Sequence, residues 1–122
     1  AEKAYSTANL FAQVIRAYRE DGWKVIGYGA PAKGNTMMNF AEEMPDYIFE
    51  DNELKQGMFT PGMHCEIRKP EWNFTEEDNV LWVPLAWNFY DEIVDKIEAN
   101  TNAGKNHYMK FFPNFEVHLW KD

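Results

Sequence analysis

The segment VIGYGAPAKGNTMMNF, at residues 25–40, limits what this chain can fold into more than any other. It begins as a short apolar run, rich in β-branched and aromatic residues, that ends at Gly29. A proline, a lysine and Gly34 follow, and apolar residues then return with helical spacing from Met37. We interpret the segment as a buried strand, a tight glycine turn and a helix. Such a unit is typical of parallel sheets in which helices connect successive strands.

The remaining segments continue this alternation of helical and strand-like patterns. Apolar residues spaced by three and four predict helices at about 5–21, 37–44 and 89–97. Short β-rich or alternating runs predict strands at 23–29, 46–52, 63–67 and 79–85, and one strand or a pair of strands at 107–120. In this order the elements predict an α/β fold, a Rossmann-like three-layer sandwich with a mostly parallel sheet and helices on both faces.

Length and charge narrow the classes of partner. With 122 residues, the chain has the length of one domain, spanning 1–122. A formal net charge of −8 opposes attraction to nucleic acids and anionic membranes, so we expect neither as a partner. No run of about 18 apolar residues predicts a membrane span, and the start shows no basic segment followed by an apolar one. A small anionic ligand needs only a local basic pocket.

Cysteine and histidine content bears on location and metal binding. Cys65 has no second cysteine for an internal disulfide, which favours a reducing compartment and makes the cytoplasm the expected location. One cysteine and three scattered histidines do not supply a zinc ligand set, so no metal is expected. The residues around Cys65 do not provide the basic, exposed environment of a catalytic thiol.

The glycine turn has the chemistry of an anion site. Gly29 can adopt a positive φ and lets a ligand approach the backbone closely. The amides of Ala32, Lys33 and Gly34 would open the helix, where they have no helical partner and carry partial positive charge. Lys33 adds a mobile ammonium group. These groups together suit a phosphate.

Comparison with phosphate-binding motifs leaves alternatives open. Gly27, Gly29 and Ala32 satisfy the relaxed dinucleotide fingerprint GxGxxA, with Glu50 or Asp51 placed for a ribose. The chain would then bind NAD(P) or S-adenosylmethionine directly. The nucleotide triphosphatase loop GxxxxGK[ST] fits less well, because asparagine occupies its lysine position. A tight turn that binds nothing, in a ligand-free interaction module, is the remaining alternative.

Three segments carry a family resemblance. GYGAPAKGNT at 27–36, EDNELKQGMFTPGMHCEI at 50–67 and VPLAWNFYDEI at 83–93 resemble the C-terminal domain of the sugar C-methyltransferases. These S-adenosylmethionine-dependent enzymes methylate a carbon of a nucleotide-linked keto sugar. The resemblance spans about 5–113 and implies a Rossmann-like domain that follows a zinc-binding domain and a central methyltransferase domain.

The resemblance also implies what this chain contributes. The central domain of the family holds the methyl donor and the catalytic base, so we expect no catalytic residue and no cofactor site here. The C-terminal domain packs against the central domain and helps to form the nucleotide-sugar site, with the glycine turn facing the diphosphate. The expected partners are therefore a nucleotide sugar or another phosphate-bearing small molecule, and a methyltransferase domain or a second copy of the chain.

The expected site combines the turn with polar residues at the same edge of the sheet. Asp51 and Asn52 end a predicted strand, Lys55 offers charge to a phosphate, and His64 either reaches the crevice or serves as a loop residue. Trp87 offers a stacking surface or packs in the core, and Asn88 offers hydrogen bonds. The full set of expected ligand-binding residues is Gly29, Ala30, Pro31, Ala32, Lys33, Gly34, Asn35, Asp51, Asn52, Lys55, His64, Trp87 and Asn88.

The aromatic residues near the end of the chain are expected in the core. Phe111, Phe112, Phe115 and Trp120 alternate with other residues along the last predicted strands. Acidic residues surround them, which favours packing over a role in stacking on bases.

Overall fold

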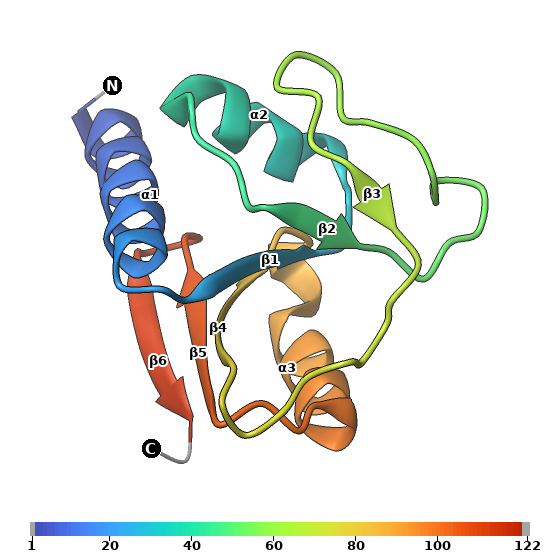
Figure 1. The fold of residues 1–122 in the computed structure, drawn as a ribbon. Coiled ribbons are helices and arrows are strands. Elements are labelled where there is room, and N and C mark those ends of the chain that lie inside the picture. Colours follow the sequence, from blue (N-terminus) through green and yellow to red (C-terminus); the bar gives the residue numbers. More distant parts are fainter. Residues whose placement is uncertain (1, 121–122) are drawn as a thin grey trace.

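A computed structural model describes residues 2–120 of the chain, and its centre is a mixed β-sheet (Figure 1). The helices are α1 (Glu2–Glu20), α2 (Ala32–Ala41), the short 3₁₀ helix η1 (Trp87–Phe89) and α3 (Tyr90–Asn100). The strands are β1 (Lys24–Tyr28), β2 (Tyr47–Phe49), β3 (Ile67–Arg68), β4 (Asn79–Pro84), β5 (Lys105–Lys110) and β6 (Glu116–Trp120).

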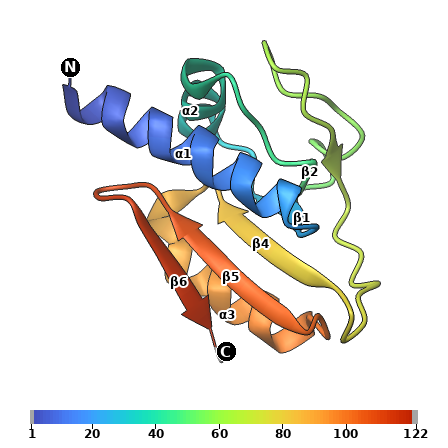
Figure 2. The same cartoon turned by 60° about the vertical axis from the view of Figure 1, so that its left-hand side comes forward.

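The strand order is β3-β2-β1-β4-β5-β6. Strands β1 to β5 pair in parallel, and β6 runs back antiparallel beside β5 at one edge of the sheet (Figure 2). The chain builds outward from β1 to β3 and then crosses to β4 on the other side of β1. The predicted α/β class with a mostly parallel sheet is confirmed, and the crossover makes the carboxyl ends of β1 and β4 a topological switch point.

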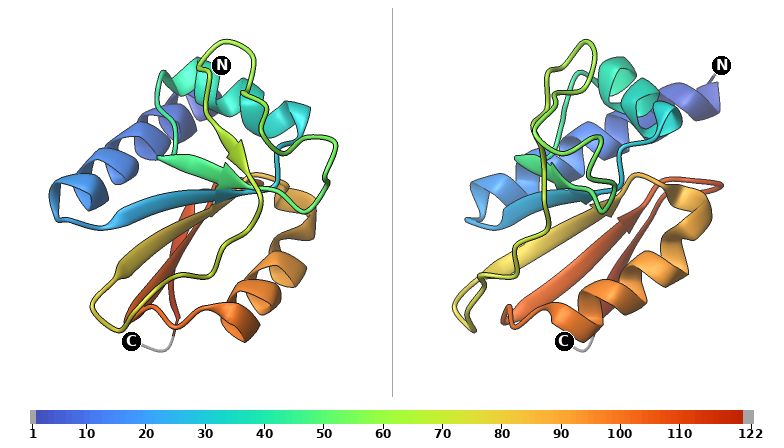
Figure 3. Two further views of the ribbon diagram at one scale, coloured as in Figure 1. Left: turned by 45° about the vertical axis from the view of Figure 1, so that its right-hand side comes forward. Right: turned by 90° about the vertical axis from the view of Figure 1, so that its right-hand side faces the viewer.

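Helices cover the two faces of the sheet, α1 and α2 on one and α3 on the other (Figure 3). The first face buries Phe11 and Ile15 of α1 and Met38 of α2. The second buries an aromatic cluster that includes Trp82 and Tyr108, against which Ile93 and Ile97 of α3 pack. The apolar stripes read from the sequence therefore face the sheet, as helical periodicity predicts.

Two predicted boundaries are wrong. The strand expected at 63–67 is only Ile67–Arg68, because the preceding residues form a turn in which His64 has φ 57 and its amide donates to the Thr60 carbonyl at 3.0 Å. The second helix ends at Ala41, before Pro45, because Glu42 adopts the left-handed conformation at φ 53. In each case a residue with positive φ interrupts the chain at a place where the spacing of apolar residues predicts that the strand or helix continues.

Within residues 2–120, none of the helices has the length and apolar character that crossing a bilayer requires.

Candidate functional site

The turn between β1 and α2 leaves three main-chain amide donors without an acceptor in the described residues. Gly29 has φ +82, and Pro31 caps α2 with extended dihedral angles and no side-chain hydrogen bond. The first backbone bond that closes the helix runs from the Asn35 amide to the Pro31 carbonyl at 3.2 Å. Within the described residues, the amides of 32–34 have no hydrogen-bond acceptor. The unpaired amides that the sequence predicted at the start of α2 are therefore present, and their role in binding an anion stays a prediction.

The turn is held against the carboxyl end of β4. A Cβ atom added to Gly34 would lie 2.7 Å from the Cβ of Leu85, and one added to Gly29 would lie 3.1 Å from the Cβ of Ala86. Both glycines are thus required by close packing against one dipeptide, and Gly29 also by its positive φ. This contact fixes the start of α2 above the switch point of the sheet.

Two ammonium groups and one carboxylate approach the turn. The Lys33 ammonium lies 5.0 Å from the centroid of the Trp87 ring, and Lys55 donates to the Ala30 carbonyl at 3.3 Å. The Glu50 carboxylate accepts from the amides of Ala30 and Asn52, each at 3.0 Å. Glu50 therefore ties the turn to the end of β2 but also places a negative charge two residues from the open amides.

The Asp51 carboxylate is held by two partners. It accepts from the Tyr28 hydroxyl at 2.8 Å and pairs with the Lys96 ammonium of α3 at 2.6 Å. Burial, together with the hydrogen bond to Asp51, raises the pKa of Tyr28 well above its usual range, so the phenol stays protonated as the donor. Asn52 accepts from the Leu54 amide at 3.0 Å. Both residues reach the expected edge of the sheet, with these side-chain oxygens engaged in the fold.

Comparison with known proteins assigns the family. Residues 1–112 match the model of the C-methyltransferase C-terminal domain. The chain belongs to this family. It is also 31% identical over 97 residues to the C-methyltransferase NovU of Streptomyces niveus, an alignment that covers 76% of this chain and 23% of that protein. The chain thus spans about a quarter of the length of this curated relative.

Within this C-methyltransferase C-terminal domain, His64 lies away from the turn. Its neighbour Met63 donates its amide to the Asn39 side chain at 3.1 Å, in the second half of α2. The His64 side chain is exposed, and its φ of 57 marks a turn position. The structure therefore groups Lys55 and Trp87 with the start of α2 and places His64 elsewhere.

Asn35 is an unusual member of the first turn of α2. Its Oδ1 atom is buried and has no hydrogen-bond partner within the described residues. A buried amide oxygen without a donor costs free energy, and such atoms are rare in folded proteins. The assignment of Asn35 to the site stays a prediction, and the unpaired Oδ1 atom is a feature of α2 that the sequence did not indicate.

The sequence predicts Phe112 in the core, but in the structure its side chain is exposed. Of the expected core aromatics, Phe111 is buried and Phe115 is half-buried, whereas the Trp120 side chain lies outside the described part of the chain. Phe112 falls in the turn between β5 and β6, is 46% exposed and packs against Trp87 with ring centroids 4.0 Å apart. The aromatic alternation gave no sign of this, because the strand ends at Lys110.

Cys65 has no features of a nucleophile in this domain. Its side chain is buried, and its thiol donates to the Pro45 carbonyl at 3.5 Å. Burial, with smaller contributions from Asp46 and Glu66, raises the pKa of the thiol to about 11. Since the thiolate is the reactive form, Cys65 is a packing residue.

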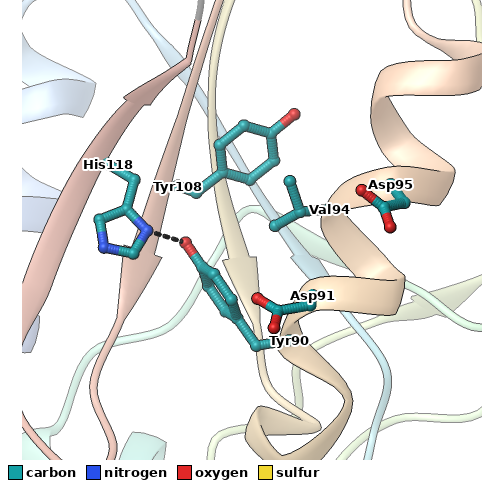
Figure 4. Close-up of a pocket in the computed structure, with 6 residues that line it drawn as sticks. All are labelled: Tyr90, Asp91, Val94, Asp95, Tyr108 and His118. Atoms are coloured by element: carbon teal, nitrogen blue, oxygen red, sulfur yellow. Dashed lines mark hydrogen bonds between the residues drawn. The ribbon is translucent and has the colours of Figure 1, made fainter.

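A cavity of about 180 Å³ lies between α3, β5 and β6, away from the turn (Figure 4). It is lined by Tyr90, Asp91, Val94, Asp95, Tyr108 and His118. The Tyr90 hydroxyl and Nδ1 of His118 are hydrogen-bonded at 2.7 Å, and the Tyr108 hydroxyl donates to Glu98. Its phenol groups are thus occupied within the fold, and none of the expected site residues lines it.

Proposed function

We propose that this C-methyltransferase C-terminal domain binds the diphosphate of a nucleotide-linked sugar at the β1–α2 turn. The three unpaired amides at 32–34 carry the proposal, because they belong to the turn that follows β1, beside the switch point of the sheet, and have no acceptor in the described residues. The ammonium groups of Lys33 and Lys55 lie beside the same turn and offset the phosphate charge.

The engaged carboxylates favour a nucleotide sugar over a dinucleotide. In the dinucleotide fingerprint, the acid after the second strand accepts from the ribose hydroxyls. Here both oxygens of Glu50 accept from backbone amides, and Asp51 is bound to Tyr28 and Lys96. A ribose would have to share these carboxylate oxygens with donors that already occupy one lone pair of each, whereas a diphosphate at the unpaired amides competes with none of these bonds.

The domain then acts by positioning its substrate. We propose that the methyl donor and the base that activates the sugar carbon come from another part of the full-length protein. Binding and orientation by this domain lower the barrier only when that part presents the donor. We propose the cytoplasm as the location of the domain, because Cys65 has no second cysteine in this sequence with which to form an internal disulfide.

Titration calorimetry with inorganic pyrophosphate, UDP-glucose, NAD⁺ and S-adenosylmethionine tests the proposal. We expect pyrophosphate and UDP-glucose to bind, with affinity that falls as salt increases, and Lys33→Ala combined with Lys55→Ala to weaken both. Lys105→Ala is the matched control, because this exposed lysine begins β5 at the opposite end of the sheet.

Two results would replace the proposal. Binding of NAD⁺ or S-adenosylmethionine without pyrophosphate or UDP-glucose would make the turn a cofactor site. Binding of none of the four compounds would favour a ligand-free interaction module.

A further inference from the structure

Two aromatic side chains, Trp87 and Phe112, lie next to the proposed diphosphate site. Trp87 follows the Leu85–Ala86 dipeptide that contacts the glycine turn, and the Lys33 ammonium lies 5.0 Å from its ring centroid. The Phe112 ring packs on the same indole, with the ring planes inclined by 35°. The contacts therefore run without a break from the first turn of α2, through Trp87, to Phe112.

Sheet topology explains why these residues meet. Strands β1, β4 and β5 are parallel, so their carboxyl ends share one edge of the sheet (Figure 3). The glycine turn follows β1, Trp87 follows β4, and Phe112 lies in the turn after β5. Ligands of open α/β sheets bind in the crevice outside this edge.

The two rings have different surroundings. Trp87 is partly buried, packs against the core cluster beneath α1 and α2, and has the Lys33 ammonium 5.0 Å from its ring centroid. Phe112 has 46% of its surface exposed and is supported from behind by the indole. An aromatic side chain has few rotatable bonds, so a supported, exposed ring loses little entropy when a flat ligand stacks on it.

We propose that Phe112 stacks on the nucleobase of the bound nucleotide sugar, and that this chain therefore selects a nucleoside diphosphate over a bare diphosphate. The inference rests on the proposed diphosphate site. Bases stack on aromatic side chains regardless of sequence, because every base has a π-face. The exposed amide of Asn88, next to Trp87, can both donate to and accept from the edge of that base.

Calorimetry with the 122-residue chain tests this role by comparing uridine diphosphate with inorganic pyrophosphate. We expect uridine diphosphate to bind about tenfold more tightly, at the lower end of the range for stacking on one aromatic ring. Phe112→Ala should remove most of this preference and leave the affinity for pyrophosphate unchanged. Phe112→Leu, which keeps an apolar side chain without a π-face, should behave like Phe112→Ala, and Phe112→Trp should retain the preference.

Phe40→Ala is the matched control. Phe40 is 47% exposed, but it lies near the end of α2, far along the helix from the glycine turn. The control should bind both compounds as the unaltered chain does. A similar loss in Phe40→Ala would assign the preference to general apolar surface and overturn the role of Phe112.

The outcomes separate this inference from the function on which it rests. Equal affinity for the two compounds, or a preference that survives both Phe112→Ala and Phe112→Leu, would overturn the stacking role while leaving the diphosphate site intact. Failure of pyrophosphate and uridine diphosphate alike to bind would overturn both proposals.

Discussion

The Glu50 carboxylate accepts a hydrogen bond from the Ala30 amide at 3.0 Å, and thereby joins the end of β2 to the turn that opens α2. The second oxygen of the same carboxylate accepts from the Asn52 amide. Glu50 thus fixes the turn by hydrogen bonding and, by its charge, opposes an anion at the neighbouring amides. These two effects can be separated by substitution.

Glu50→Gln should bind pyrophosphate more tightly while folding less stably. The amide side chain keeps one acceptor but loses the charge, so we expect affinity at low salt to rise by about two- to fivefold and the gain to shrink at high salt. Loss of one hydrogen bond should lower the free energy of unfolding by about 1 kcal/mol. Calorimetry at two salt concentrations and denaturant unfolding measure the two effects. Weaker binding at low salt would show that Glu50 supports the ligand instead of opposing it.

Gly34→Ala should destabilise the domain although alanine is the better helix former. The added Cβ would lie 2.7 Å from the Cβ of Leu85 and 3.2 Å from its carbonyl oxygen, so α2 must shift away from β4. Overpacking costs about 1–3 kcal/mol, which outweighs the gain of about 1 kcal/mol in helix propensity. Urea unfolding should show a lower midpoint, and a midpoint at or above that of the unaltered chain would mean that the contact is not tight in solution.

Asn35→Ala should stabilise the folded domain and weaken its ligand binding. The substitution removes a buried Oδ1 atom that lacks a donor in the described chain, and this should raise the free energy of unfolding by about 1 kcal/mol. If Asn35 contributes to the diphosphate site, affinity for pyrophosphate should fall at the same time. Thermal unfolding without pyrophosphate measures the change in stability, and the shift of the midpoint on adding pyrophosphate measures the change in binding. A loss of stability without ligand would show that the oxygen has an internal partner.

Cys65 should contribute a loss of stability in alkali. Its pKa is raised from 9.0 to about 11 by burial, so between these values the unfolded chain releases a proton that the folded chain retains. The stability is fully present below pH 9 and is lost as pH rises toward 11, by an amount on the order of 2 kcal/mol. The difference in free energy of unfolding between the unaltered chain and Cys65→Ala should therefore shrink over this range. The tyrosines with raised pKa values are common to both chains and cancel. A constant difference would contradict the assignment.

Features set by local sequence were predictable, and features set by distant partners were not. The order of strands and helices follows from the spacing of apolar residues, and the position of the turn follows from Gly29 and Gly34. Both could be predicted because each pattern lies within a few neighbouring residues. The ion pair of Asp51 could not be predicted in this way, because its partner Lys96 is 45 residues away in the sequence. The exposure of Phe112 depends on where β5 turns back into β6, which the continuous aromatic pattern concealed.

The dipeptide Leu85–Ala86 touches both glycines of the turn and leads directly into Trp87. This dipeptide therefore positions both the start of α2 and the Trp87 side chain. Substitutions meant to change the nucleotide preference proposed for this domain should leave the dipeptide untouched and vary the outward-facing side chains around it, because a bulkier residue here would shift the start of α2 and Trp87 together.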